Sequence, residues 1–414
     1  MAQVAYYFST KFPALTTTFT QHQVRATAQL GLDFIMAANY PPPPGQFHPQ
    51  DADLRDRTFY LTPVQPLRYL RANLRALKRW PRPYARALFL ALRLGRDFPR
   101  QQLTNLGHLA GAAVLAEYLR AHRVPHVHVN FAFGAADVAI FLETMSGIPY
   151  SLSIHGSDVL LENPLLEEKL RRARFIVSNC RFHVDNLRRR FPILERQRFH
   201  VIYGGLDLTA GPWSRITPPP KDLPLRILHI GRLVPVKAQE VLILALARLR
   251  DQGRSFECRI VGDGPLRADL QNLVASLNLQ DRVHLLGDRF AEEVAGLFDW
   301  CQVLVLSSRS EGTPMVIIEA MAKARAVVAP RLTAIPEMVV DGKTGYLFRT
   351  GDAGDLAAQL ERLTAQTEVA AHLGREGRSR AEALFDLNRN ARELMAVFAR
   401  ELPRAQGRRE KAAP

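Results

Sequence analysis

Short apolar runs alternate along this chain with longer segments of helical periodicity. The first series of apolar runs lies at residues 4–8, 32–40, 126–132, 149–156, 174–180 and 198–205, and the second at 225–231, 256–264, 283–287, 301–308, 326–330 and 345–348. Helical patterns occur within the second series at about 237–251, 265–278 and 314–323. Alternation of strands with helices predicts parallel α/β sheets, which bind ligands at the carboxyl ends of their strands.

The two series predict two doubly wound domains, as the length of 414 residues also favours. A stretch with three consecutive prolines separates them and reads as a linker. We expect a first domain at 1–210, a linker at 211–224 and a second domain at 225–386. A final helix at 387–402 is expected to return to the first domain, and the polar tail 403–414 to be disordered.

Basic residues are concentrated in the first half of the chain. Residues 1–215 hold 27 Lys and Arg against 15 Asp and Glu, whereas 216–414 hold 28 against 25. The segment 66–100 alone holds ten basic residues and one acid, Asp97. This asymmetry predicts an anionic partner for the first domain, such as a phosphorylated lipid, a membrane surface or nucleic acid. Nucleic acid is disfavoured because the basic segment lacks the interleaved aromatic residues of a stacking platform.

The start of this basic segment has an amphipathic pattern. Leucines at 67, 70, 74 and 77 fall on one helical stripe, and basic residues flank that stripe: Arg68, Arg71, Arg75, Lys78 and Arg79. One interpretation places the helix on an anionic membrane surface. In the other, the leucines pack on the first domain and the basic side chains are solvated.

Composition indicates a soluble protein of the cytoplasm. No uninterrupted apolar run approaches the length of a membrane span, and the N-terminal residues lack the pattern of a signal peptide. Three scattered cysteines favour neither a disulfide framework nor a thiolate metal site.

Two glutamates stand eight residues apart in the stretch "EGTPMVIIEA", at Glu311 and Glu319. Glu319 lies in an apolar context, where an unpaired carboxylate is costly. Thr313 suits a helix N-cap and Pro314 a first helical position, so the free N–H groups of Met315 and Val316 would form an anion site. Two carboxylates beside such a site suit a ligand with a diphosphate centre and hydroxyl-bearing ends. Alternatively, Glu319 accepts hydrogen bonds from nearby backbone or an arginine.

Two glycine-containing strand exits add candidate ligand contacts. "HIGRLVPVK" places Gly231, Arg232 and Lys237 after a strand, where glycine permits close approach and two cations suit a pyrophosphate. "IVGDGPL" places Gly262 after the next strand. The competing interpretation is an ordinary surface loop. The dinucleotide fingerprint and the P-loop are both incomplete.

Histidines mark two places in the first domain. "SIHGSDV" puts His155 and Asp158 at a strand exit, either as contacts to a reacting sugar or as a structural histidine and a capping aspartate. His126 and His128 alternate on one strand without other residues of metal-ligand spacing, and we interpret them as structural.

Taken in order, these segments resemble glycosyltransferase family 4, the retaining, nucleotide-sugar-dependent enzymes of the GT-B fold. The resemblance covers most of the chain and runs through "FSTKFPALTTTF", "HVHVNFA", "SIHGSDV", "VIYGGLDL", "LHIGRLVPVK", "IVGDGPLRADL", "HLLG", "SEGTPMVIIEAMA", "IPEMV" and "DGKTGYLF". The N-terminal part looks most like the branch that builds exopolysaccharides such as colanic acid. The family implies an α/β fold with two Rossmann-like domains facing a central cleft.

The resemblance also implies roles for individual residues. Glu311 would contact the hydroxyls of the donor sugar, Glu319 the ribose hydroxyls, and Arg232 with Lys237 the diphosphate. His155 would lie beside the transferred sugar, and it joins Glu311, Arg232 and Lys237 as the expected catalytic set. The other expected donor contacts are Gly231, Gly262, Gly312, Met315 and Val316, and the acceptor-side candidates are Thr17, Thr18 and Asp158.

The chain departs from the family pattern at Thr17, where a glutamate is common, at Asn130, at Gly204, at Ala324, and at Thr333-Ala334, where two glycines are usual. The donor residues are intact, so these departures concern the acceptor.

The resemblance implies transfer of a sugar from a UDP- or GDP-sugar to a lipid-linked or polysaccharide acceptor, in exopolysaccharide, capsule or lipopolysaccharide synthesis. It implies no cofactor, no essential divalent metal, and a position on the inner face of the cytoplasmic membrane. Two alternatives remain: a nucleotide-sugar epimerase of the same fold, which needs no acceptor, and a catalytically silent membrane- or polysaccharide-binding subunit.

Overall fold

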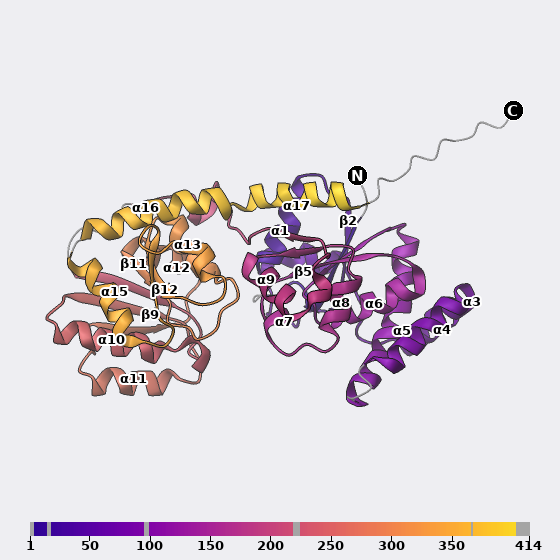
Figure 1. Ribbon diagram of the computed structural model, residues 1–414, viewed down its shortest axis with the longest axis horizontal. Helices are drawn as coiled ribbons and strands as arrows, with labels where there is room; N and C mark the ends of the chain where they lie inside the picture. The colour runs from indigo at the N-terminus through magenta and orange to yellow at the C-terminus, as the bar shows by residue number, and fades with distance from the viewer. Residues whose placement is uncertain (1–3, 15–17, 95–98, 218–223, 366, 403–414) are drawn as a thin grey trace. The chain divides into compact units, whose positions relative to one another are not determined.

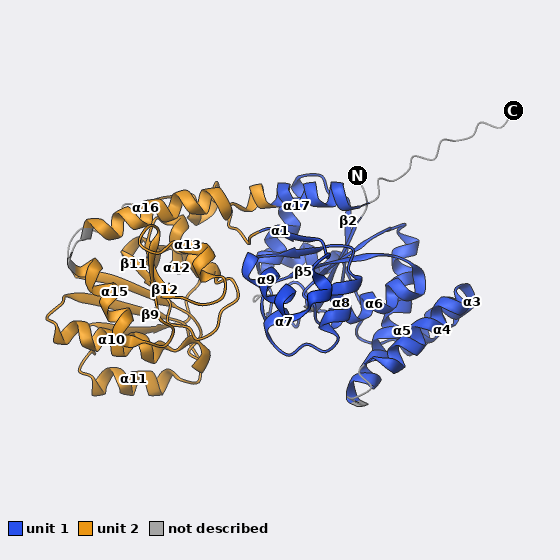
Figure 2. Ribbon diagram, viewed as in Figure 1, with its two compact units in different colours: residues 1–202, 391–414 blue, residues 203–390 orange. Residues whose placement is uncertain are grey.

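The computed structural model describes residues 4–14, 18–94, 99–217, 224–365 and 367–402 (Figure 1). The chain forms two compact units (Figure 2), one of residues 1–202 and 391–414 and one of residues 203–390. None of the helices in the described ranges combines the length and the apolar character that a membrane crossing needs.

Unit 1 is built on a parallel sheet with the strand order β3-β2-β1-β4-β5-β6-β7. Its strands are β1 (Val4–Lys11), β2 (Phe34–Tyr40), β3 (Thr58–Tyr60), β4 (Val127–Asn130), β5 (Tyr150–Ile154), β6 (Ile176–Ser178) and β7 (Phe199–Val201). Its helices are α1 (Thr18–Gln29), η1 (Pro49–Asp51), α2 (Ala52–Arg57), α3 (Pro66–Arg79), α4 (Pro81–Arg93), α5 (Pro99–Ala121), α6 (Gly134–Ser146), α7 (Ser157–Leu160), α8 (Leu166–Arg172), α9 (Arg181–Arg190), η2 (Pro192–Leu194) and most of α17 (Leu387–Glu401).

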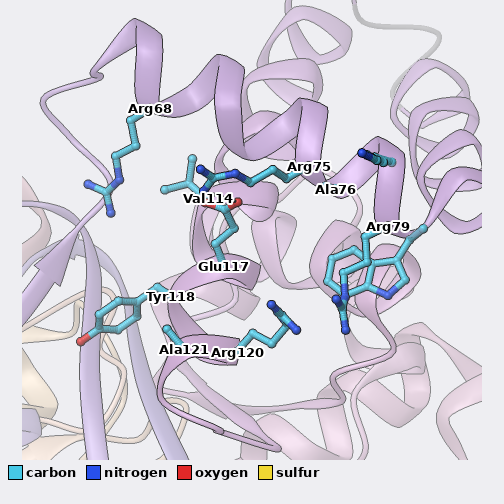
Figure 3. A pocket seen from close by; sticks show the side chains of 11 residues that line it. Arg68, Arg75, Ala76, Arg79, Val114, Glu117, Tyr118, Arg120 and Ala121 are labelled. Carbon is cyan, nitrogen blue, oxygen red and sulfur yellow. Dashed lines mark hydrogen bonds and ion pairs between the residues drawn. The ribbon is translucent and has the colours of Figure 1, made fainter.

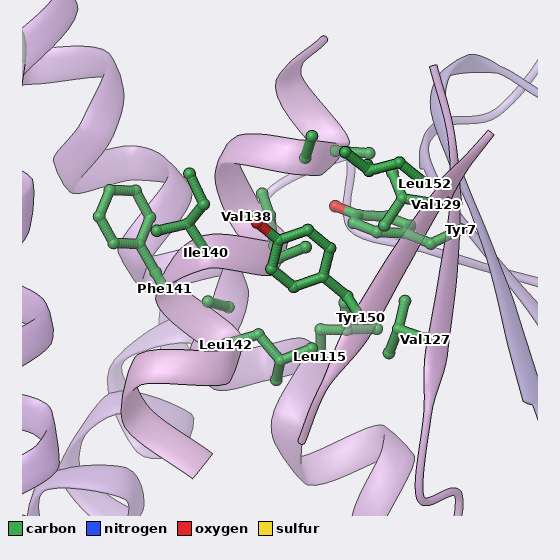
Figure 4. Close-up of a cluster of buried hydrophobic side chains, with 14 of the residues drawn as sticks. Tyr7, Leu115, Val127, Val129, Val138, Ile140, Phe141, Leu142, Tyr150 and Leu152 are labelled. Carbon is green, nitrogen blue, oxygen red and sulfur yellow. The ribbon is translucent and has the colours of Figure 1, made fainter. Parts of the chain in front are cut away.

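The sheet of unit 1 is buried on both faces, as parallel sheets require. Figure 4 shows one face, where Val127, Val129 and Leu152 of the strands pack with Leu115 of α5 and Val138 of α6. On the other face, α17 contributes Leu394, Val397 and Phe398 to a cluster with Tyr6 and Phe175. The last helix is therefore part of the core of unit 1.

Unit 2 is built on a second parallel sheet, ordered β10-β9-β8-β11-β12-β13. Its strands are β8 (Leu225–Ile230), β9 (Phe256–Val261), β10 (Val283–Gly287), β11 (Val303–Val305), β12 (Ala326–Pro330) and β13 (Gly345–Phe348). Its helices are η3 (Gly211–Trp213), η4 (Pro235–Lys237), α10 (Gln239–Asp251), α11 (Arg267–Ser276), α12 (Ala291–Trp300), α13 (Met315–Ala322), α14 (Ile335–Met338), α15 (Ala353–Ala365) and α16 (Thr367–Leu384).

The strand pattern of the sequence is confirmed, since each expected apolar run forms a strand. The additional strand β3 lies at a sheet edge and is only partly buried, so it has no continuous apolar run. The expected α/β class with two doubly wound units is also confirmed.

The boundary between the units differs from the expected position. The first unit ends at residue 202, and residues 203–213 belong to unit 2, because Leu206, Leu208 and Trp213 pack on its core. The predicted linker 211–224 thus begins with a short helix of unit 2. Residues 218–223 of that linker and the tail 403–414 lie outside the described residues.

Candidate active site

In each sheet the strand order reverses between two neighbouring central strands, β1 and β4 in unit 1 and β8 and β11 in unit 2. The loops after two such strands leave in opposite directions and open a crevice at the carboxyl edge, the usual ligand site of these sheets. In unit 2, Arg232 and Lys237 follow β8, and Glu311 follows β11. The sequence-predicted donor residues therefore flank the reversal point.

Lys237 and Glu311 form a close ion pair across this point. Lys237 Nζ lies 2.6 Å from Glu311 Oε1, and Ser308 Oγ donates a hydrogen bond to the same oxygen at 2.6 Å. The Glu311 side chain is only 10% exposed, so the pair is shielded from water and its attraction is strengthened. Lys237 and Ser308 together fix the direction of the Glu311 carboxylate.

The main chain around Glu311 is held by a strained residue. Thr333 Oγ1 donates to the Glu311 carbonyl oxygen at 2.7 Å, and Thr333 itself has a φ of 42°. A β-branched residue rarely adopts this left-handed conformation. In this conformation the Thr333 hydroxyl is hydrogen-bonded to the main chain of Glu311.

Arg232 differs from Lys237 in its surroundings. Its side chain is exposed, and its guanidinium has no hydrogen-bond or ion-pair partner among the described residues. The Gln239 side chain donates to the Arg232 carbonyl oxygen at 2.9 Å, which anchors the loop while leaving the guanidinium free. Arg232 is therefore the available cation at the end of β8.

The loop after β9 lies against the loop that carries Arg232. Gly262 has a φ of 124°, and a Cβ at this position would lie 2.2 Å from the Gly231 carbonyl oxygen. Only glycine allows this contact between the two main chains. Gly262 acts by positioning Gly231 and Arg232.

Glu319 is half-buried in α13, among the buried side chains of Ile317, Ile318, Ala320 and Met321. Burial raises the pKa of its carboxyl group to about 7. Within the described part of the chain no side chain or backbone group donates a hydrogen bond to this carboxylate. The alternative in which nearby backbone or an arginine satisfies Glu319 therefore has no support in the structure.

The start of α13 differs from the sequence-based expectation. Pro314 is the N-cap with a ψ of 111°, and the helix begins at Met315 without a side-chain cap. The expected N-cap, Thr313, has a buried hydroxyl that finds no hydrogen-bond partner in the described part of the chain. Met315 and Val316 do form the first turn, whose N–H groups suit an anion, and Gly312 lies in the loop before it.

In unit 1, His155 follows β5 and lies between two aromatic rings. Its ring centroid is 5.0 Å from that of Phe19 and 4.5 Å from that of Phe131. Burial lowers the pKa of His155 to about 3, so the imidazole is neutral at physiological pH. Its Nε2 atom is buried and has no hydrogen-bond partner among the described residues.

The Asp158 side chain binds main-chain N–H groups and is not exposed to solvent. Its carboxylate is fully buried and accepts hydrogen bonds from the N–H groups of Ala132 at 2.9 Å, His155 at 3.0 Å and Gly156 at 2.9 Å. Burial raises its pKa, while the three donors act in the opposite direction. Asp158 thus joins the loops after β4 and β5 and positions His155, as the capping interpretation held.

The remaining acceptor-side candidates are weakly defined. Thr17 lies outside the described residues, and Thr18 is the first residue of α1. His126 and His128, interpreted as structural, are fully buried and bond to Ser151 and Ser153 at 2.7 to 2.8 Å. That interpretation is confirmed.

Sequence reasoning missed several residues at these edges. Ser308 orients Glu311, and Asn179 and His183 follow β6, where Asn179 Nδ2 donates to the His155 carbonyl oxygen at 3.1 Å. His183 Nδ1 lies 3.1 Å from Asn179 Oδ1, and burial lowers the pKa of His183 to about 4. The sequence did contain a signal for Ser308 and Asn179, because polar residues that directly follow buried parallel strands lie at the carboxyl edge of the sheet.

Among the described residues, no group of three or more His, Cys, Asp or Glu side chains could hold a metal ion. The independence from divalent metals remains a prediction.

Comparisons with known proteins agree with this arrangement. The family described as "Glycosyl transferases group 1" matches residues 224–366, and "Glycosyltransferase Family 4" matches residues 78–210. An uncharacterized glycosyltransferase of Methanocaldococcus jannaschii is 30% identical over 260 residues, which are 61% of this chain and 69% of the relative. The amylovoran biosynthesis glycosyltransferase AmsK of Erwinia amylovora is 26% identical over 95% of this chain and 98% of its own.

A putative colanic acid biosynthesis glycosyltransferase of Salmonella typhimurium is 26% identical over 86% of this chain and 89% of its own. Among solved structures, Anabaena HepE has a TM-score of 0.71 at 17% identity and covers 96% of this chain and 100% of its own. The two parallel α/β units of this chain share the GT-B fold of that structure. The chain belongs to glycosyltransferase family 4, and its relatives include enzymes of the exopolysaccharide branch.

Proposed function

We propose that this glycosyltransferase moves a sugar, with retention of anomeric configuration, from a UDP- or GDP-sugar to a lipid-linked or polysaccharide acceptor. The acceptor would serve exopolysaccharide, capsule or lipopolysaccharide synthesis at the inner face of the cytoplasmic membrane. The observation that carries the proposal is the group of Arg232, Lys237, Glu311 and Glu319 at the strand reversal of unit 2, with free hydrogen-bonding capacity at Arg232 and Glu319.

The chemistry of each residue fits one part of such a donor. A nucleoside diphosphate carries two phosphates for Arg232 and for the first turn of α13, and a ribose diol whose hydroxyls can donate to Glu319. Glu311 is held in place by Lys237 and Ser308 and would accept from the sugar hydroxyls. Solved structures of HepE, whose fold is similar, contain UDP or UDP-glucose, which supports a nucleotide-sugar donor.

The acceptor class is supported by the relatives. Their names place them in amylovoran and colanic acid biosynthesis, and a structurally similar protein is a lipopolysaccharide outer core galactosyltransferase. In unit 1, the imidazole of His155 is neutral, and its buried Nε2 atom has no hydrogen-bond partner among the described residues. These relations support transfer rather than donor epimerisation.

Transfer requires that the leaving diphosphate be stabilised as negative charge develops on it. Arg232, Lys237 and the N-terminus of α13 are positive groups that can stabilise this charge. The Oε1 atom of Glu311 already accepts hydrogen bonds from Lys237 and Ser308, which makes this carboxylate a weaker nucleophile toward the sugar. We therefore propose attack on the face from which the diphosphate departs.

A thermal-shift screen tests donor binding directly. UDP- and GDP-sugars are expected to raise the melting temperature, because a ligand at about 100 times its dissociation constant adds about 2.7 kcal/mol of stability. Free sugars and nucleoside monophosphates serve as controls and should shift it less. If no nucleoside diphosphate stabilises the protein, the assignment of the unit 2 site is wrong.

Incubation of the stabilising donor with and without acceptor then separates the alternatives. A transferase consumes the donor faster when acceptor is present, an epimerase converts the donor alone, and a silent subunit does neither.

A further inference from the structure

The helix α3 exposes its leucines and buries only small residues. The exposed fractions of Leu67, Leu70, Leu74 and Leu77 are 67%, 57%, 56% and 45%, whereas Ala72 and Ala76 are buried. The interpretation in which these leucines pack on unit 1 is therefore wrong. Four leucines on one exposed helical stripe form an apolar surface without a partner in the described structure.

The neighbouring helix α4 also exposes apolar side chains. Phe89 and Leu92 are 65% and 49% exposed, and the helix buries Ala87 and Ala91. We call the exposed side chains of α3 and α4 the apolar stripe: Leu67, Leu70, Leu74, Leu77, Phe89 and Leu92.

A cationic groove runs beside α3, between it and α5 (Figure 3). Its main part has a volume of about 760 Å³, and its wall carries Arg68, Arg75, Lys78, Arg79 and Arg120 with one acid, Glu117. An adjoining hollow of about 570 Å³ adds Arg71 and is also lined by Leu67. The groove and the apolar stripe thus meet on one helix.

Most of the positive charge in this groove is not neutralised. Arg75 Nη1 lies 3.3 Å from Glu117 Oε1, but the Arg75 side chain is 71% exposed, so this pair is weak. Arg71, Lys78 and Arg120 have no ion-pair partner among the residues described. Six like charges around one groove repel each other and attract an anion.

Two of the arginines are positioned by aromatic rings. The Arg68 guanidinium carbon lies 4.4 Å from the centre of the Phe59 ring, and that of Arg79 lies 5.5 Å from the Trp80 ring. The Phe59 ring stacks in turn on Tyr118 of α5 at 3.9 Å. Stacking on a face leaves the guanidinium edges free to donate hydrogen bonds, so these side chains are oriented without being neutralised.

We propose that the groove binds the phosphate or diphosphate headgroup of an anionic membrane lipid, while the apolar stripe enters the acyl boundary. A free phosphate would contact the arginines and leave the leucines in water. A lipid would satisfy both surfaces, because it has an anionic headgroup for the groove and apolar chains for the stripe. The inference rests on the proposed function in that the lipid-linked acceptor would lie in the same membrane.

Sedimentation of the full chain with vesicles tests this assignment at low salt. The protein should bind phosphatidylcholine vesicles that contain phosphatidic acid and should not bind phosphatidylcholine alone. The double variant Arg71→Gln/Arg120→Gln should lower the apparent affinity roughly thirtyfold, since each basic residue near an anionic surface contributes about fivefold. Leu70→Gln/Leu74→Gln should also lower it, and both pairs are exposed, so the fold should be retained.

The matched control is Arg189→Gln/Arg190→Gln on α9, which removes two exposed charges from the same unit and should bind vesicles like the unchanged protein. Equal binding to neutral and anionic vesicles, or equal loss in the control, would overturn the proposal. So would binding of inorganic pyrophosphate that depends on Arg71 and Arg120 without any vesicle binding. The thermal shift by nucleotide-sugar is measured on the same variants and should be unchanged, so that failure of the donor site is distinguishable from failure of this inference.

Discussion

Replacing Arg232 with alanine is expected to slow sugar transfer by about 10²–10³-fold, while the KM for the donor changes much less. The magnitude follows from the loss of one fixed donor to a charge that develops in the transition state. Arg232 is exposed and unpaired among the described residues, so its removal leaves no buried group unsatisfied and should not affect folding. Steady-state kinetics with varied donor give both constants.

The control for this variant is Lys343→Ala. Lys343 is an exposed cation, 67% exposed, in the turn before β13 at the amino edge of the same sheet, and its removal should leave both constants near those of the unchanged protein. If Arg232 were an ordinary surface residue that binds no ligand, Arg232→Ala would also keep normal turnover and a normal KM for the donor. Near-normal turnover in Arg232→Ala would therefore contradict our assignment.

Lys237→Ala is expected to cost more turnover than Arg232→Ala, because Lys237 has two roles in the proposed site. It would supply a charge for the diphosphate, and it holds the Glu311 carboxylate at 2.6 Å. The sequence pattern gave no reason to distinguish the two cations. The structure distinguishes them, because Lys237 is paired with Glu311 and Arg232 is not paired among the described residues. Turnover of either variant relative to the unchanged protein, measured in the same assay, shows the difference.

Activity is expected to survive EDTA if these cations meet the charge of the leaving diphosphate by themselves. The assay compares turnover before and after chelation and after adding back Mg²⁺. Complete loss in EDTA with recovery on adding Mg²⁺ would contradict this mechanism.

The sequence predicted the fold well because most of its strands are buried on both faces and appear as continuous apolar runs. The three-residue strand β3 gives no such run. The boundary at residue 202 depends on which core receives Leu206, Leu208 and Trp213, and this long-range packing has no local signal.

The sequence predicted which residues belong to the candidate site, and the structure shows which of them contact one another. The nearness of Lys237 and Glu311 follows from the pairing of β8 with β11, which a one-dimensional pattern does not contain. Thr313 has the composition of an N-cap, yet the chain geometry places Pro314 there. Asp158 and His155 lie three residues apart, and only the hydrogen bonds show that the first positions the second.

Glu319→Gln is expected to stabilise the ligand-free protein at pH 8 and to have little effect at pH 5. Burial raises the pKa of Glu319 from an ordinary value of 4.5 to about 7. Between these values the folded state binds more protons than the unfolded state, so the contribution of Glu319 to stability falls as the pH rises through this window. Above pH 7 the ionised carboxylate costs roughly 3 kcal/mol, and glutamine removes that cost.

Melting temperatures of the two proteins from pH 5 to pH 8 measure this difference. Glu292→Gln, at an exposed carboxyl group of α12, is the control for replacing a glutamate with glutamine. A constant offset between Glu319→Gln and the unchanged protein across the range would show that Glu319 is not destabilised by ionisation.

The same substitution is expected to weaken binding of the free nucleoside diphosphate roughly 10- to 100-fold, because a hydrogen bond to a charged group is lost. Ribose hydroxyls that donate to Glu319 favour its ionised form and lower its pKa, so binding near pH 7 should release a fraction of a proton. Calorimetry in two buffers of different ionisation enthalpy measures that release. Glu319→Gln should remove the part that belongs to this carboxyl group, and any proton from the nucleotide phosphates remains as the background.

Glu311→Gln should keep both the proton release and the nucleotide affinity but lose turnover of the full donor, since its carboxylate is assigned to the sugar. Equal nucleotide affinity and equal proton release in both variants would mean that Glu319 does not bind the ribose.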